Sequence, residues 1–173
     1  MSRMDWKILL LLVVILWLQM TIMPLFEFYG VAIDLILLYI SFLAFIFEYR
    51  RVLLFAFVAG CFKDLLTEAF FGLETVSLVC GTLILKQIAV QFDRQDERVQ
   101  GLGIFLFSFS VSLIHAVLLA LVEEHYHLGS FVWFQSVLIA LYAAVSSIFV
   151  FPVLKHLFRI QPTLKQYELF EAN

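Results

Sequence analysis

The amino-acid sequence predicts an all-α integral membrane protein: one domain over residues 1–173 with six transmembrane helices and both chain ends cytoplasmic. Three observations lead to this fold class. Hydrophobic residues make up 64% of the chain, charged residues only 14%, and mean hydropathy is +1.02, far from the balance of soluble domains. Apolar runs recur six times, each close to the ~20 residues that cross ~30 Å of hydrocarbon. Finally, the basic residues between these runs fall on one side of the membrane.

The first span is predicted at about 8–26, after the basic residues Arg3 and Lys7. No small-residue cleavage site follows this run. We therefore expect an uncleaved helix with a cytoplasmic N-terminus rather than a secretory signal. Gln19 is a polar residue within the span, and we expect it to hydrogen-bond to another helix.

The second span is predicted at 31–47, with Asp34 one turn inside it. A tight turn then leads into the third span, so the two helices are expected to be antiparallel neighbours. An isolated ammonium group at that depth would be costly in free energy. We therefore expect Lys63 of the third span to pair with Asp34 or Asp64.

The third span, predicted at 52–67, is the most unusual stretch, because it places two charges in an apolar run. At about 100° per residue, small and polar side chains share one helical face and large apolar side chains cover the rest. A charge near the bilayer centre costs about 2.5 to 3.5 kcal/mol, so Lys63 and Asp64 should face protein or water. The small residue Gly60 beside them would let another helix approach closely.

The last three spans are predicted at 73–90, 102–122 and 131–154. The first of them carries Glu74 and the second carries His115. The fourth and sixth spans also have faces of small residues, which favour close helix packing. These residues are Ser77 and Gly81 in the fourth span, and Ser136, Ala140, Ala143, Ala144 and Ser147 in the sixth.

The basic residues define the predicted topology. Ten of the eleven Lys and Arg residues fall in the segments assigned to the cytoplasmic side: Arg3, Lys7, Arg50, Arg51, Lys86, Arg94, Arg98, Lys155, Arg159 and Lys165. The outer segments contain no Lys or Arg, and their charged residues are all acidic: Glu27, Glu68, Glu74, Glu123 and Glu124. This asymmetry satisfies the positive-inside rule. It also places five ionisable residues in the outer half of the bilayer, where they are expected to share one polar layer: Asp34, Lys63, Asp64, Glu74 and His115.

The sequence offers little for catalysis or metal binding. Cys61 and Cys80 lack ligand-spaced partners, no nucleophile has a base and an orienting group at suitable spacing, and no Gly-rich phosphate loop occurs. The residues Glu123, Glu124, His125 and His127 are of types that bind metals, but an acidic outer loop is the commoner meaning. We therefore expect no enzyme activity, cofactor, metal or nucleic-acid partner.

Seven residues are similar in order and spacing to the rod shape-determining protein MreD family of bacteria: Leu18, Gln19, Asp34, Gly60, Asp64, Gly72 and Leu73. The layout matches over most of the chain, while the motif lies between Leu18 and Leu73. Two positions depart from the family pattern. Ile33 stands where members usually have Pro, and Lys63 is not expected beside the Asp.

The resemblance implies a bundle similar to the S-components of energy-coupling-factor vitamin transporters, in the bacterial cytoplasmic (inner) membrane. It also implies a non-enzymatic subunit of the cell-elongation complex that helps regulate peptidoglycan synthesis and cell shape. The expected partner is MreC, a bitopic protein, and through it RodA, a class B penicillin-binding transpeptidase and MreB. Seven residues are expected to form a surface that binds the partner or a polar layer in the outer half of the membrane: Asp34, Gly60, Lys63, Asp64, Gly72, Glu74 and His115.

The small, polar face of the third span is the expected contact surface for this partner. Gly60→Leu should then block the partner's approach while insertion stays near normal, because lipid tolerates leucine. Two other functions remain open. A vitamin-binding S-component would need an alanine-rich first span, but the first span here contains no alanine, and a membrane enzyme would need catalytic groups that the sequence lacks.

Overall fold

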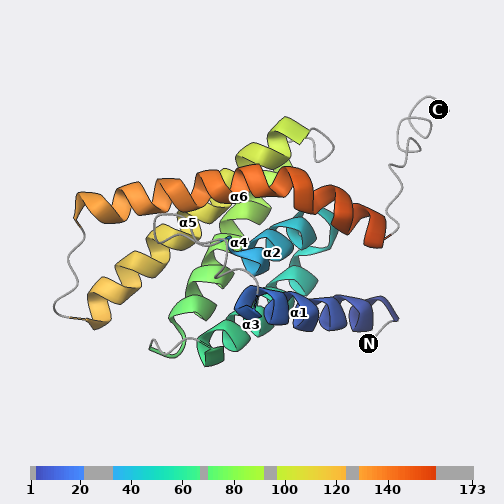
Figure 1. The fold of residues 1–173 in the computed structure, drawn as a ribbon, viewed down its shortest axis with the longest axis horizontal. Helices are drawn as coiled ribbons and strands as arrows, with labels where there is room; N and C mark the ends of the chain where they lie inside the picture. Colours follow the sequence, from blue (N-terminus) through green and yellow to red (C-terminus); the bar gives the residue numbers. More distant parts are fainter. Residues whose placement is uncertain (1–2, 22–32, 67–69, 92–96, 124–128, 159–173) are drawn as a thin grey trace.

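The structure, a computed structural model, describes residues 3–21, 33–66, 70–91, 97–123 and 129–158. Within these residues it contains six α-helices and no strand, which confirms the predicted all-helical fold with six helices. The helices are α1 (Arg3–Thr21), α2 (Leu35–Ile46), α3 (Tyr49–Leu66), α4 (Leu73–Gln91), α5 (Glu97–Val122) and α6 (Ser130–Leu157) (Figure 1).

Helix α2 is the centre of the fold and packs against each of the other five helices. All its residues from Ile36 to Phe45 are buried. A helix that is apolar all round is stable when protein or lipid covers every side, and here other helices provide much of that cover. Figure 1 shows α2 lying between α1 on one side and α6 on the other.

The prediction for the second span was wrong in its start and in the place of Asp34. The helix begins at Leu35, and Asp34 is its N-cap in an extended conformation (φ −91°, ψ 93°) rather than a residue one turn inside. Residues 31–32 of the predicted span lie outside the described part of the chain. With 12 residues, α2 is about 18 Å long at ~1.5 Å per residue, shorter than ~30 Å of hydrocarbon.

The remaining helices surround α2 in chain order. The pairs α3 with α4, α4 with α5, and α5 with α6 pack along one another, whereas α1 packs against α2. Tyr39 of α2 fixes α1 from within, because its hydroxyl donates to the Ile8 carbonyl oxygen at 2.9 Å. Three residues further along α2, the ring of Phe42 makes an edge contact with Phe151 of α6, with centroids 5.3 Å apart.

The helix ends extend beyond several of the predicted spans. Helix α3 begins at Tyr49 and α5 at Glu97, so part of the charged stretch before the fifth span is helical and not a loop. Apolar runs mark the part of a helix that lipid would cover, whereas charged flanks do not stop a helix from continuing. Residues 22–26, 67, 92–96 and 124–128, which belong to predicted spans or loops, lie outside the described residues, as does the basic tail from residue 159.

The helices differ in length and in what they expose. Two of them, over Gln100–Val122 and Ser130–Leu157, are long and apolar enough to cross a membrane. Every helix except α2 exposes large apolar side chains, such as Trp17, Leu54, Leu121 and Phe149. Several polar side chains are buried instead, including Thr82. The six-span topology itself stays a prediction.

Candidate functional site: a polar cluster where four helices meet

The polar cluster consists of Asp34, Lys63, Asp64, Glu74 and His115, which come from the helices α2, α3, α4 and α5. Lys63 lies at its centre. It belongs to the last turn of α3, and its ammonium lies 2.7 Å from Asp34 Oδ2 and 2.9 Å from Glu74 Oε2. The three side chains are only 19%, 17% and 15% exposed, so solvent screens these ion pairs weakly. The expected pair with Asp34 is therefore present. The second partner is Glu74 from the first turn of α4, whereas Asp64 binds elsewhere.

The start of α2 is held by side chains from two other helices. Asp34 Oδ1 accepts a hydrogen bond from the Leu37 N–H at 3.0 Å, while Oδ2 binds Lys63 of α3. Gln19 of α1 accepts from the Leu35 N–H at 2.7 Å and donates to the Ile33 carbonyl at 3.1 Å. The expected interhelical hydrogen bond of Gln19 is thus made to backbone. These contacts satisfy N–H groups that a helix start leaves without a partner in the helix.

Asp64 performs the same task for α4. Its side chain is almost fully buried, with Oδ1 accepting from the Glu74 N–H at 3.0 Å and Oδ2 accepting from the Thr75 N–H at 3.1 Å. The Thr75 hydroxyl also donates to Oδ2. A carboxylate at this place is favoured by the partial positive charge of the helix N-terminus. Just before α4, Gly72 adopts φ +102°. Residues other than glycine rarely adopt this backbone conformation, because their Cβ atom would clash.

Gly60 lies inside the bundle and not on a partner surface. A Cβ atom added to Gly60 would lie 2.5 Å from Thr75 Cα, so α3 and α4 touch at this point. Gly60→Leu would therefore do more than block a partner, because the larger side chain must push α4 away. The expected near-normal insertion of this variant stays a prediction.

The small-residue faces of α4 and α6 point inward as well. A Cβ at Gly81 would overlap Val111 Cγ2 of α5. Ser136, Ala140, Ala143 and Ser147 of α6 are buried, and Ser112 of α5 donates to Ser136 at 3.0 Å. These faces therefore join helices within the chain.

His115 extends the cluster to α5. Its Nδ1 lies 3.8 Å from Glu74 Oε1 and makes no hydrogen bond within the described residues. All five ionisable residues expected in one layer are thus brought together. Three carboxylates are bound by an ammonium group or by backbone N–H groups. The arrangement is therefore suited to joining helix ends, rather than to activating a nucleophile.

Two residues that hold helix ends were not predicted from the sequence, namely Thr75 and Lys86. Thr75 follows Glu74 in the first turn of α4. At this position its hydroxyl can reach the side chain that caps the helix, which is Asp64. Lys86 was counted among the cytoplasmic residues, but it is buried in α4 and its ammonium donates to the carbonyl of Phe47, the C-cap of α2. The position of Lys86 inside the predicted span 73–90 could have indicated that its side chain is buried and bound within the bundle. Helix α2 therefore has Asp34 at its N-terminus and Lys86 at its C-terminus, each of the sign that the helix dipole favours.

The other candidate groups form no metal cluster within the part of the chain that the structure describes. Cys61 and Cys80 are partly exposed and form no disulfide. Of the four residues with metal-binding side chains in the predicted outer loop, Glu124, His125 and His127 lie outside the described residues. A comparison of the chain with protein-family models gave no match, and searches of curated proteins and of solved structures also gave no significant match.

Proposed function

We propose that this chain is a non-enzymatic, multi-pass subunit of the bacterial inner membrane that serves the cell-elongation machinery in the manner of MreD and binds an MreC-like bitopic protein. One observation carries the proposal. Residues that bear the resemblance, spread from the first span to the fourth, meet at one end of the bundle. Gln19 and Asp34 hold the start of α2, Gly60 and Asp64 join α3 to α4, and Gly72 forms the turn into α4.

This convergence argues that the resemblance reflects one structural element. A chance match of common residues would scatter them over unrelated surfaces, whereas these five residues each lie at a helix end or a helix crossing. The element joins α1, α2, α3 and α4. Such a brace gives a rigid scaffold on which outer faces of the bundle can hold a partner in a fixed orientation.

The surface supports a membrane setting. Large apolar side chains remain exposed on five helices, while charged and hydroxyl side chains are buried among them. In water this distribution would leave an exceptional apolar area uncovered. In lipid it is the expected one, because polar groups must find partners inside the bundle.

A vitamin-binding S-component is the competing proposal, and no observation favours it. The outward face of α1 consists of bulky side chains, including Trp6, Leu10, Val13 and Trp17, where close docking of a second helix would call for small ones. The polar cluster is filled by its own ion pairs.

Cell shape tests the proposal in the bacterium that carries the gene. Depletion of the protein should turn rods into round cells, and expression of the wild-type chain should restore rods. Arg51→Gln, which changes an exposed residue at the opposite end of α3, should restore them equally. Lys63→Met should restore them poorly, because it leaves Asp34 and Glu74 unpaired. Rods that persist after depletion would refute a role in elongation.

A further inference from the structure

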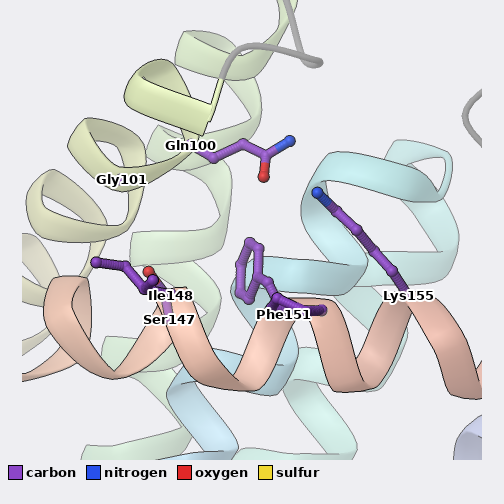
Figure 2. A pocket seen from close by; sticks show the side chains of 7 residues that line it. Gln100, Gly101, Ser147, Ile148, Phe151 and Lys155 are labelled. Atoms are coloured by element: carbon purple, nitrogen blue, oxygen red, sulfur yellow. The ribbon is translucent and has the colours of Figure 1, made fainter.

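A small cavity opens at the end of the bundle opposite the polar cluster, where α5 begins and α6 ends. Its volume is about 100 Å³. It is lined by Gln100, Gly101, Ser147, Ile148, Phe151, Pro152 and Lys155 (Figure 2). The floor is rigid, because the buried ring of Phe151 packs against Phe42 and Phe45 of α2 with centroids 5.3 and 6.4 Å apart.

The cavity is lined by polar as well as apolar side chains. Figure 2 shows the side chains of Gln100 and Lys155 reaching toward each other from α5 and α6 above the Phe151 ring. The Gln100 side chain is held in place by burial, with 9% of the residue exposed. The ammonium group of Lys155 suits an anionic oxygen group, and lysine is a common binder of phosphate in proteins.

The size and the remaining walls narrow the class of ligand. A cavity of about 100 Å³ is well below the ~300 to 1,000 Å³ of pockets that enclose a small molecule, so only a headgroup can enter. Ile148 and Pro152 are apolar walls, and next to them the surface of α6 exposes Phe149 and Val153. A ligand with one anionic group and long apolar chains matches both parts of this surface.

We propose that the cavity binds the phosphate group of an anionic glycerophospholipid, with Lys155 donating to its oxygens. The acyl chains lie along the exposed apolar side chains of α6. This inference rests on the membrane setting of the proposed function but not on its partner. The predicted topology places this end on the cytoplasmic side, where anionic lipids attract basic residues. Free phosphate offers the same anionic chemistry without the chains.

Gly101 provides a variant that fills the cavity. A Cβ atom at this position meets no atom within 4 Å, so Gly101→Leu can be accommodated while its side chain takes up the space of the ligand. Lys155→Gln removes the charge and keeps the length of the stem. Arg51→Gln is the matched control, because it removes an exposed basic residue at the same end of the bundle without touching the cavity.

The test uses the purified full chain in neutral detergent. Binding of phosphatidylglycerol, phosphatidylcholine with the same chains, and inorganic phosphate is titrated by native mass spectrometry. Phosphatidylglycerol should bind most tightly, and Lys155→Gln should weaken it about fivefold. Gly101→Leu should weaken it at least as much, whereas Arg51→Gln should change it less than twofold. Circular dichroism checks that each variant keeps its helices; if Lys155→Gln does not, Gly101→Leu decides.

Two results would overturn the proposal. The first is equal weakening by Lys155→Gln and Arg51→Gln, or no weakening by Gly101→Leu, either of which would mean attraction to the general surface. The second is inorganic phosphate that binds as tightly as phosphatidylglycerol and displaces it, which would make a free anion the ligand. Neither result involves the MreC-like partner, so the proposed function and the lipid site fail independently.

Discussion

The Lys63 ammonium lies 2.7 Å from Asp34 Oδ2, so the end of α3 is joined to the N-cap of α2. The same ammonium lies 2.9 Å from Glu74 Oε2 and so reaches the first turn of α4. One cation thus connects three helix termini. Asp64, the neighbour of Lys63 in the chain, adds a second connection from α3 to α4 through the backbone of Glu74 and Thr75.

Lys63→Met should lower the free energy of unfolding by about 3 kcal/mol, because it leaves two mostly buried carboxylates without a cation. Adding Asp34→Asn should recover part of this loss, since one of the unpaired charges is removed. A coupling of about 1 to 2 kcal/mol between the two changes is expected from denaturant titration in detergent micelles. Simple additivity of the two losses would contradict the pairing.

Asp64→Ala should destabilise the protein more than Thr75→Val. The alanine leaves the N–H groups of Glu74 and Thr75 without their acceptor, at a cost of about 3 kcal/mol, whereas the valine removes one hydroxyl donor at about 1 kcal/mol. Thr75→Ser is the control, because it keeps the hydroxyl. Thermal unfolding in micelles measures the order. Asp64→Ala with wild-type stability would show that Asp64 does not hold α4.

Gly60→Ala and Gly101→Ala form a matched pair of substitutions in helices. The first places a Cβ 2.5 Å from Thr75 Cα and should cost about 1 to 3 kcal/mol, because backbone must move. The second meets nothing within 4 Å and should be neutral or stabilise by about 0.5 to 1 kcal/mol, since alanine favours a helix over glycine. Equal stability of the two variants would contradict the close contact of α3 with α4.

The sequence predicted six helices because each apolar run has a helical length and ends at a polar segment. It also predicted that Lys63 pairs with Asp34 or Asp64, since a buried charge near a tight turn has few possible partners, and the structure shows the pair with Asp34. It did not predict that Glu74 would be the second partner. Lys63 and Glu74 belong to different helices, and Gly72 before the second of them has a positive φ. Helical periodicity does not extend through such a turn, so it cannot predict which side chains meet.

The central position of α2 in the bundle could not be predicted from the sequence either. A 12-residue apolar helix looks the same whether lipid or protein covers it, and only the packed structure shows that five helices surround it. The same limit applies to Gly60 and to the small residues of α6. Their spacing indicates close packing, but the partner helix is not encoded in the spacing, and here it belongs to the same chain.

A reporter that is active only outside the cytoplasm tests the membrane topology. A fusion after Leu128 should give signal and a fusion after Asp96 should not, because the basic residues fall on the side that contains Asp96. Cytoplasmic reporters at the same two positions should give the opposite pattern. Signal from the Asp96 fusion alone would invert the assignment, and signal from neither would argue against insertion.

Co-purification of the partner tests the proposed function most directly. The tagged chain is extracted from membranes of its own bacterium in mild detergent after brief cross-linking, and bound proteins are quantified against an untagged strain. We predict enrichment of a single-span protein of the MreC type with wild type and Arg51→Gln, and loss of it with Lys63→Met in proportion to the folded protein. Extraction without any such protein, or with the subunits of a vitamin transporter in its place, would contradict the proposal.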